Sequence, residues 1–96
     1  MSDVVAKAVT ALNDKLDGKG IDGTVKFNIE GEGSIMLDSD GARVGDDEAD
    51  VTFNADTETL KELFDGDLAP TSAFMSGRLS IDGDMGLAMK LAATLA

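Results

Sequence analysis

Residues 74–95 read FMSGRLSIDGDMGLAMKLAATL, and this stretch decides the fold class. Leu79 and Ile81 alternate with polar residues, which predicts a short strand with one buried face. Gly83 predicts a turn after that strand, and Asp84 is a good N-cap for a helix that fills the rest of the stretch. A strand that turns directly into an apolar helix predicts a helix packed back against a sheet.

The expected final helix is apolar on more than one side. One stripe contains Met85, Ala88, Met89 and Ala92, and a second contains Leu87, Leu91 and Leu95. A helix that covers a sheet needs one apolar stripe about 100° wide. The second stripe therefore contacts something else, and the pattern leaves three possibilities open: more core, a partner subunit, or an apolar ligand.

The residues before this stretch predict one helix, four strands and two short helices. Apolar residues at helical spacing, followed by a glycine-rich stop, predict the first helix, with the stripe Val5, Val9, Leu12 and Leu16. Alternating apolar residues predict strands at 24–30, 34–38, 42–45 and 49–55. The period then becomes helical, with Asp56 or Thr57 as the cap of one short helix and Pro70 in the first turn of another.

This order, α-β-β-β-β-α-α-β-α, predicts a single α+β domain over residues 1–96. Strands that alternate this cleanly favour a five-stranded, mostly antiparallel sheet with one face covered by helices and the other in water. The strand at 78–82 follows a helical crossover, so we expect it to join the sheet parallel to a neighbour.

Composition excludes several classes of function. With 19 acidic and 8 basic residues, the net charge is −11, which disfavours nucleic-acid binding and docking on anionic membranes. No apolar run reaches the roughly 20 residues that a membrane span needs, and the first residues do not resemble a signal peptide. The chain has no cysteine, so we expect a cytoplasmic protein without disulfides.

The sequence also argues against catalysis, metals and cofactors. It has no His, Cys or Tyr, so the common triads and the nitrogen and sulfur metal ligands are absent. Asp38-Ser39-Asp40-Gly41 resembles the start of a calcium loop, but Ala42 and the residues after it do not supply the later ligands, and a hairpin turn is expected instead. We therefore expect no enzyme activity.

The stretch AFMSGRLSIDGDMGLAMKL at 73–91 closely resembles the sterol carrier protein 2 domain family. The family pattern A-F-x-x-G-K/R-L-x-I-x-G-D/N-M-G-L-A-M-K-L matches nearly position by position. The acidic turn at 45–50, followed by a strand and a Leu-Lys-Glu-Leu helix at 60–63, is also similar to that family. The likeness spans roughly residues 5–95 and is specific from Phe74 onward.

The resemblance implies a helix-backed five-stranded sheet that encloses an apolar tunnel. It implies non-catalytic, reversible binding of lipids: sterols, fatty acyl chains, isoprenoids or phospholipids. The ligand-binding residues that it implies are Phe74, Met75, Leu79, Ile81, Met85, Met89 and Leu91, with Phe53, Phe64, Phe27 and Ile29 as further contributors.

Two further expectations concern partners. Arg78 and Lys90 lie among apolar residues, where each either meets an acidic ligand head group or remains a solvated surface charge. The alternative to lipid binding is an interaction or dimerisation module that uses the apolar final helix. We expect a monomer or a weak homodimer.

Overall fold

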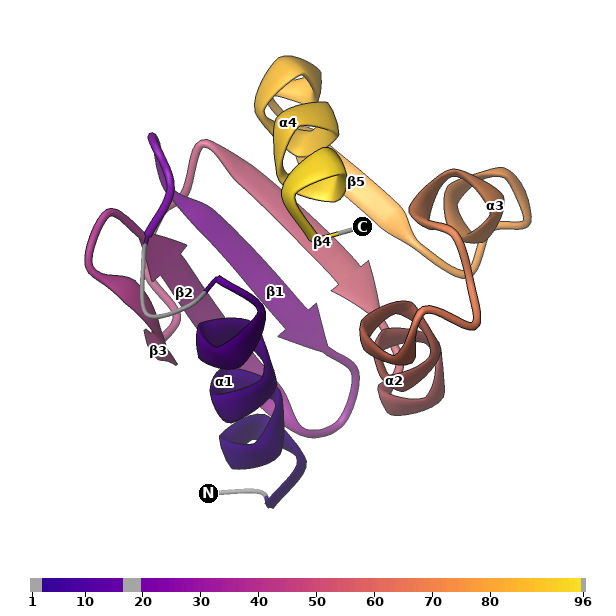
Figure 1. The fold of residues 1–96 in the computed structure, drawn as a ribbon, viewed down its shortest axis with the longest axis horizontal. Helices are drawn as coiled ribbons and strands as arrows, with labels where there is room; N and C mark the ends of the chain where they lie inside the picture. The colour runs from indigo at the N-terminus through magenta and orange to yellow at the C-terminus, as the bar shows by residue number, and fades with distance from the viewer. Residues whose placement is uncertain (1–2, 17–19, 96) are drawn as a thin grey trace.

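The computed structural model describes residues 3–16 and 20–95, apart from the side chains of Phe64 and of residues 92–95. The elements follow the expected order α-β-β-β-β-α-α-β-α (Figure 1). Their bounds are α1 (Asp3–Lys15), β1 (Val25–Ile29), β2 (Gly33–Asp38), β3 (Gly41–Val44), β4 (Val51–Ala55), α2 (Thr57–Asp65), α3 (Pro70–Met75), β5 (Ser80–Gly83) and α4 (Met85–Leu95).

In the described part of the chain, five strands form one sheet in the order β3-β2-β1-β4-β5. The pairs β1–β2, β2–β3 and β4–β5 are antiparallel, which confirms a mostly antiparallel sheet. The expectation that the fifth strand is the parallel one is wrong, because the parallel pair is β1–β4. In Figure 1, α2 and α3 lie near the end where β4 leaves the sheet, so β5 starts from that end and runs back along β4.

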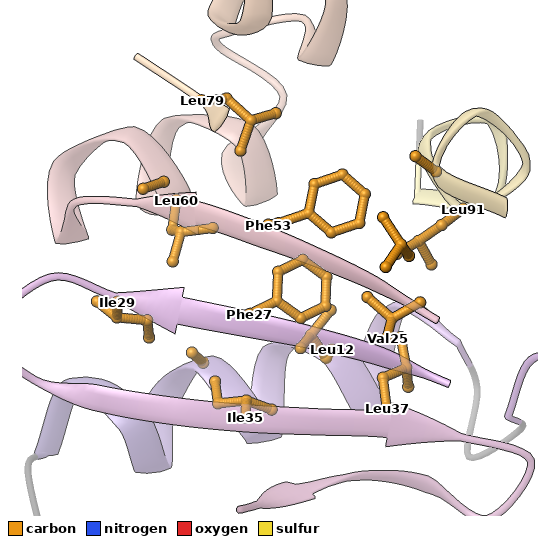
Figure 2. Packing of buried hydrophobic residues seen from close by; sticks show 14 of the residues in the cluster. Leu12, Val25, Phe27, Ile29, Ile35, Leu37, Phe53, Leu60, Leu79 and Leu91 are labelled. Atoms are coloured by element: carbon orange, nitrogen blue, oxygen red, sulfur yellow. The ribbon is translucent and has the colours of Figure 1, made fainter. Parts of the chain in front are cut away.

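The helices cover one face of the sheet. α1 packs over β2 and β3, and α4 packs over β4 and β5 (Figure 1). The apolar residues that the alternation predicted to face inward are buried between these layers. At the centre, the rings of Phe27 and Phe53 stack with centroids 5.2 Å apart, and Leu12 and Leu91 approach them from α1 and α4 (Figure 2).

The opposite face of the sheet carries a row of polar side chains. The Asn28 amide donates a hydrogen bond to the Asn54 side-chain oxygen at 3.0 Å, and the Asn54 amide donates to Asp82 at 3.4 Å. The Ser34 hydroxyl donates to the Asn28 oxygen at the other end of the row. These cross-strand pairs link β2, β1, β4 and β5 and leave this face polar, as the alternation predicted.

One segment, residues 45–50, crosses this polar face between β3 and β4. Lys26 forms an ion pair with Asp46 at 3.0 Å, and Met36 lies under Gly45 with 1% of its surface exposed. Met36 occupies a position where the alternation predicted a wet side chain. Its burial follows from the crossing segment, which no local pattern in the sequence indicates.

The N-cap of α2 is Asp56. Its carboxylate accepts a hydrogen bond from the Thr59 backbone N–H at 2.8 Å. Hydrogen bonding to Thr59 holds the pKa of Asp56 below its usual value, because it favours the charged carboxylate. The stability that this cap gives to the start of α2 therefore depends on pH.

We expect Asp56→Asn to make the stability of the protein less sensitive to acid. Because the pKa of Asp56 is lower in the folded state, its carboxylate stabilises the fold above the unfolded-state pKa, and this stabilisation is lost as pH falls through the folded pKa. Asn is still a good N-cap but does not titrate. Urea unfolding midpoints at pH 7 and pH 3 measure the difference.

Asp47→Asn is the matched control for this measurement. Asp47 is exposed and has no hydrogen bond or ion pair with the residues that the structure describes. An equal change in acid sensitivity for Asp56→Asn and Asp47→Asn would contradict a role for the cap.

Candidate ligand-binding site

Helix α4 faces the sheet along one narrow line. Ala88 and Leu91 are each 2% exposed and belong to the core. The helix begins as expected at Asp84, whose carboxylate accepts a hydrogen bond from the Leu87 N–H at 3.1 Å. Among the side chains that the structure describes on α4, this line takes one residue from each predicted apolar stripe, and it leaves Met85 and Met89 outside the core at 45% and 64% exposure.

The two flanks of α4 differ in chemistry. Successive helical residues are rotated by about 100°, so Met85 and Met89 lie on the flank opposite Leu87 and Lys90. The Lys90 ammonium is 3.7 Å from the Asp22 carboxylate, which places the Leu87–Lys90 flank against the segment that precedes β1. The methionine flank therefore faces the other way, toward the side of the molecule where Figure 1 shows α3.

Helix α3 also exposes apolar side chains. Ala73 anchors it to the core at 0% exposure, while Phe74 and Met75 are 44% and 79% exposed. We call Phe74, Met75, Met85 and Met89 the α3–α4 apolar surface. Among the described side chains, the large hydrophobic residues that are exposed are these four and Val44. Exposed apolar surface thus gathers on the two helices that precede and follow β5.

Two apolar residues lie between α3 and α4 in the sequence and point toward the core. They are Leu79, just before β5, and Ile81, within it. Leu79 is 4% exposed, and Ile81 packs partly buried against the core. Ile81 is also the register partner of Phe53 on β4.

The residues implied by the resemblance thus divide into two groups. Phe53, Leu79 and Leu91 are core residues (Figure 2), as are Phe27 and Ile29, and Ile81 lies at the core's edge. Phe74, Met75, Met85 and Met89 are exposed. The side chain of Phe64, on α2, lies outside the described part of the structure.

The structure also contains hollows that sequence reasoning did not indicate. One, of about 390 Å³, lies between α4 and the segment before β1, and Ile21, Leu87, Lys90 and Leu91 line it. Another of about 390 Å³, which we call the α1–α2 pocket, is lined by Val4, Lys7, Ala8, Ile29, Leu60 and Lys61, among others. The two helices that form its walls, α1 and α2, are some 50 residues apart in the chain, so no local sequence pattern predicts the pocket.

Both cations that the sequence placed near the expected site contact carboxylates. The Arg78 guanidinium donates a hydrogen bond to Glu62, which raises the pKa of Arg78. Lys90 lies near Asp22. These pairs fix the loop before β5 to α2, and α4 to the segment before β1.

The described residues contain neither a metal-binding cluster nor a membrane-spanning helix. No group of three or more His, Cys, Asp or Glu side chains there is placed to hold a metal ion. None of the helices described between residues 3 and 95 has both the length and the hydropathy of a membrane span.

Comparison with known proteins gives a consistent result. The model of the SCP-2 sterol transfer family matches residues 6–96. Hydroxysteroid dehydrogenase-like protein 2 of Danio rerio is 44% identical over an alignment of 81 residues, which covers 76% of this chain and 20% of that protein. The chain thus spans about a fifth of the length of the curated relatives that it matches first.

Solved structures show the same fold. The sterol carrier protein 2 like 2 of Aedes aegypti has a TM-score of 0.79 at 20% identity, with 94% of each chain covered. Sterol carrier protein 2 of Aedes aegypti, solved in complex with the C16 fatty acid palmitate, also has a TM-score of 0.79. It is 19% identical, with 100% of this chain and 97% of that one covered.

Proposed function

The chain belongs to the SCP-2 sterol transfer family, and from this premise we propose that it binds lipids reversibly and without catalysis. The observation that carries the proposal is the α3–α4 apolar surface. A chain with net charge −11 exposes three methionines and a phenylalanine on the two helices next to β5 in the sequence. Contiguous exposed apolar patches mark binding sites, and we propose that these four side chains form one.

The expected ligand has a long apolar part, such as a fatty acyl chain, an isoprenoid or a sterol. Each Å² of apolar surface removed from water contributes about 25 cal/mol, less the cost of ordering the ligand. Methionine side chains suit this role because they are flexible and adapt to different apolar shapes. The palmitate complex of the Aedes aegypti protein, which shares the fold, supports a fatty acyl chain as the first ligand to test.

Entry of the ligand to the core side of α4 requires that helix to shift. Gly83, with φ of +112°, joins β5 to α4, and Gly86 lies in the first turn. We propose these two glycines as hinges. The floor beneath would then be formed by Leu79 and Ile81, with Leu91 above them on α4 itself and Phe53 and Phe64 as further contacts.

We assign no dehydrogenase activity to this chain. Its curated relatives carry that word in their name, but the match covers about a fifth of their length. The sequence has no Tyr, His or Cys to act as an acid, base or nucleophile. We propose that the chain supplies lipid binding alone.

Solvent extraction and mass spectrometry of the purified chain test the proposal directly, together with titration by a fluorescent C16 fatty acid. We expect a co-purified lipid, or saturable uptake that unlabelled palmitate reverses. Absence of saturable uptake of fatty acid, sterol and isoprenoid probes alike would overturn lipid binding.

The α3–α4 apolar surface is also the observation that favours the alternative, a weak homodimer or a docking site for another protein. Met75, at 79% exposure, is the most exposed residue of the surface. Sedimentation velocity over a range of concentrations separates the two. A dimer that forms without lipid and excludes the fatty acid would favour the alternative.

We also propose a cytoplasmic location, which is compatible with the absence of cysteine and is tested by imaging the tagged protein.

A further inference from the structure

The α1–α2 pocket shares no lining residue with the α3–α4 apolar surface. Helices α1 and α2 contact each other and lie side by side in Figure 1. Ile29, at the end of β1, and Leu60, on α2, are 2% and 4% exposed and form its base. Figure 2 shows both at the same end of the core. The base of the pocket is therefore apolar and fixed by the core.

Two lysines, one on each helix, line this apolar pocket. Lys7 and Lys61 are exposed, and neither forms an ion pair or hydrogen bond with the residues that the structure describes. Lys26, Arg43 and Arg78, by contrast, each lie within ion-pair distance of a carboxylate. In a chain with 19 acidic residues, two unpaired ammonium groups beside one apolar pocket form a local cationic site.

From this combination we propose that the α1–α2 pocket is a second ligand site, which binds a single-chain amphiphile with an anionic head group. The apolar chain would lie on Ile29, Leu60 and Ala8, and the head group would lie between the two lysines. Charge-assisted hydrogen bonds from both ammonium groups would hold a carboxylate there. This site does not depend on the function proposed for α3 and α4.

The size of the pocket sets the length of the ligand. A volume of about 390 Å³, at roughly 30 Å³ for each water-sized group, holds about a dozen non-hydrogen atoms. A carboxylate with an eight-carbon to ten-carbon chain fills this volume, so decanoate is the ligand to test. Asp65 also lines the pocket, one turn beyond Lys61, so the head group between the two lysines is expected to lie nearer to Lys7.

Titration of the ¹⁵N-labelled chain with decanoate at low salt and neutral pH tests the proposal. We expect saturable shifts of the amide signals of α1, α2 and Ile29. Decanol and decyltrimethylammonium, which have the same chain without the negative charge, should bind more weakly. The double variant Lys7→Gln with Lys61→Gln should weaken decanoate binding by roughly three-fold to ten-fold, because exposed ion pairs contribute modestly.

Lys15→Gln is the matched control. Lys15 is also an exposed lysine on α1 and has no ion pair with a residue in the described part of the chain, but it does not line the pocket, so its loss should leave decanoate binding unchanged. Equal binding of decanoate and decanol would overturn the proposal. Shifts confined to α3, α4 and β5, or equal weakening by Lys15→Gln and the double variant, would overturn it as well.

Discussion

Replacing Gly83 with alanine is expected to destabilise the protein by about 2–5 kcal/mol. Gly83 has φ of +112°, and a Cβ built there would lie 2.3 Å from the Asp50 carbonyl oxygen and 3.0 Å from Val51 Cα. Left-handed backbone costs a non-glycine residue about 1–2 kcal/mol, and overpacking adds about 1–3 kcal/mol. Because both close atoms are backbone, relief requires β5 to move away from β4.

This loss is large relative to the total stability of about 5–15 kcal/mol that is typical of single domains. Urea unfolding followed by circular dichroism measures it. The amide signals of β4 and β5 should show the largest changes, because the Asp84 N–H donates to the Asp50 carbonyl at 2.9 Å across this junction.

Gly66→Ala is the control that isolates the contact from the backbone conformation. Gly66 ends α2 with φ of +81°, but nothing lies within 4 Å of a Cβ built there. It should lose about 1–2 kcal/mol from the left-handed backbone alone. If the two substitutions lower the free energy of unfolding equally, the close packing of Gly83 against β4 does not contribute to the loss.

Met89→Asp is expected to reduce fatty acid uptake by at least about ten-fold, since a carboxylate has no partner against an apolar chain. Met89 is 64% exposed and lies outside the core cluster. Its replacement should therefore change the stability of the protein by less than about 0.5 kcal/mol, as is usual for surface positions. Titration with a fluorescent C16 fatty acid, together with a urea unfolding curve, measures both quantities.

Val44→Asp is the matched control. Val44 is 46% exposed on β3, away from α3 and α4, and its replacement adds the same charge. Its uptake should equal that of the unsubstituted chain. Equal loss of uptake in both variants would mean that net charge, rather than the α3–α4 apolar surface, controls binding. Sedimentation of Met89→Asp also tests the alternative, since a dimer built on this surface would dissociate.

Much of the fold was predictable because its signals are local. The alternation of Val25, Phe27 and Ile29 predicted a strand and its buried face, and all three are in the core. Asp84 was expected to cap α4, and Asp56 or Thr57 to cap α2. In the structure Asp56 and Asp84 each accept a backbone hydrogen bond there. Caps and periodicity involve residues a few positions apart, so the sequence carries them directly.

The pairing of strands was not predictable in the same way. Alternation says which side of a strand is buried, but it does not say which strand is its neighbour. The parallel partner of β1 is β4. The segment that leads from β3 to β4 crosses the polar face of the sheet, where it buries Met36 and forms an ion pair with Lys26. A strand's hydrogen-bond partner is set by the path of the whole chain, which a local pattern does not contain.

For the candidate site, the sequence by itself determined that α4 has more apolar surface than one sheet contact requires. Only the tertiary structure decided that Ala88 and Leu91 face the sheet while Met85 and Met89 face away from it. It alone brought Lys7 and Lys61 to one pocket. The physical reason is that composition and periodicity fix how apolar each face of an element is, whereas the packing of distant elements fixes which faces remain uncovered.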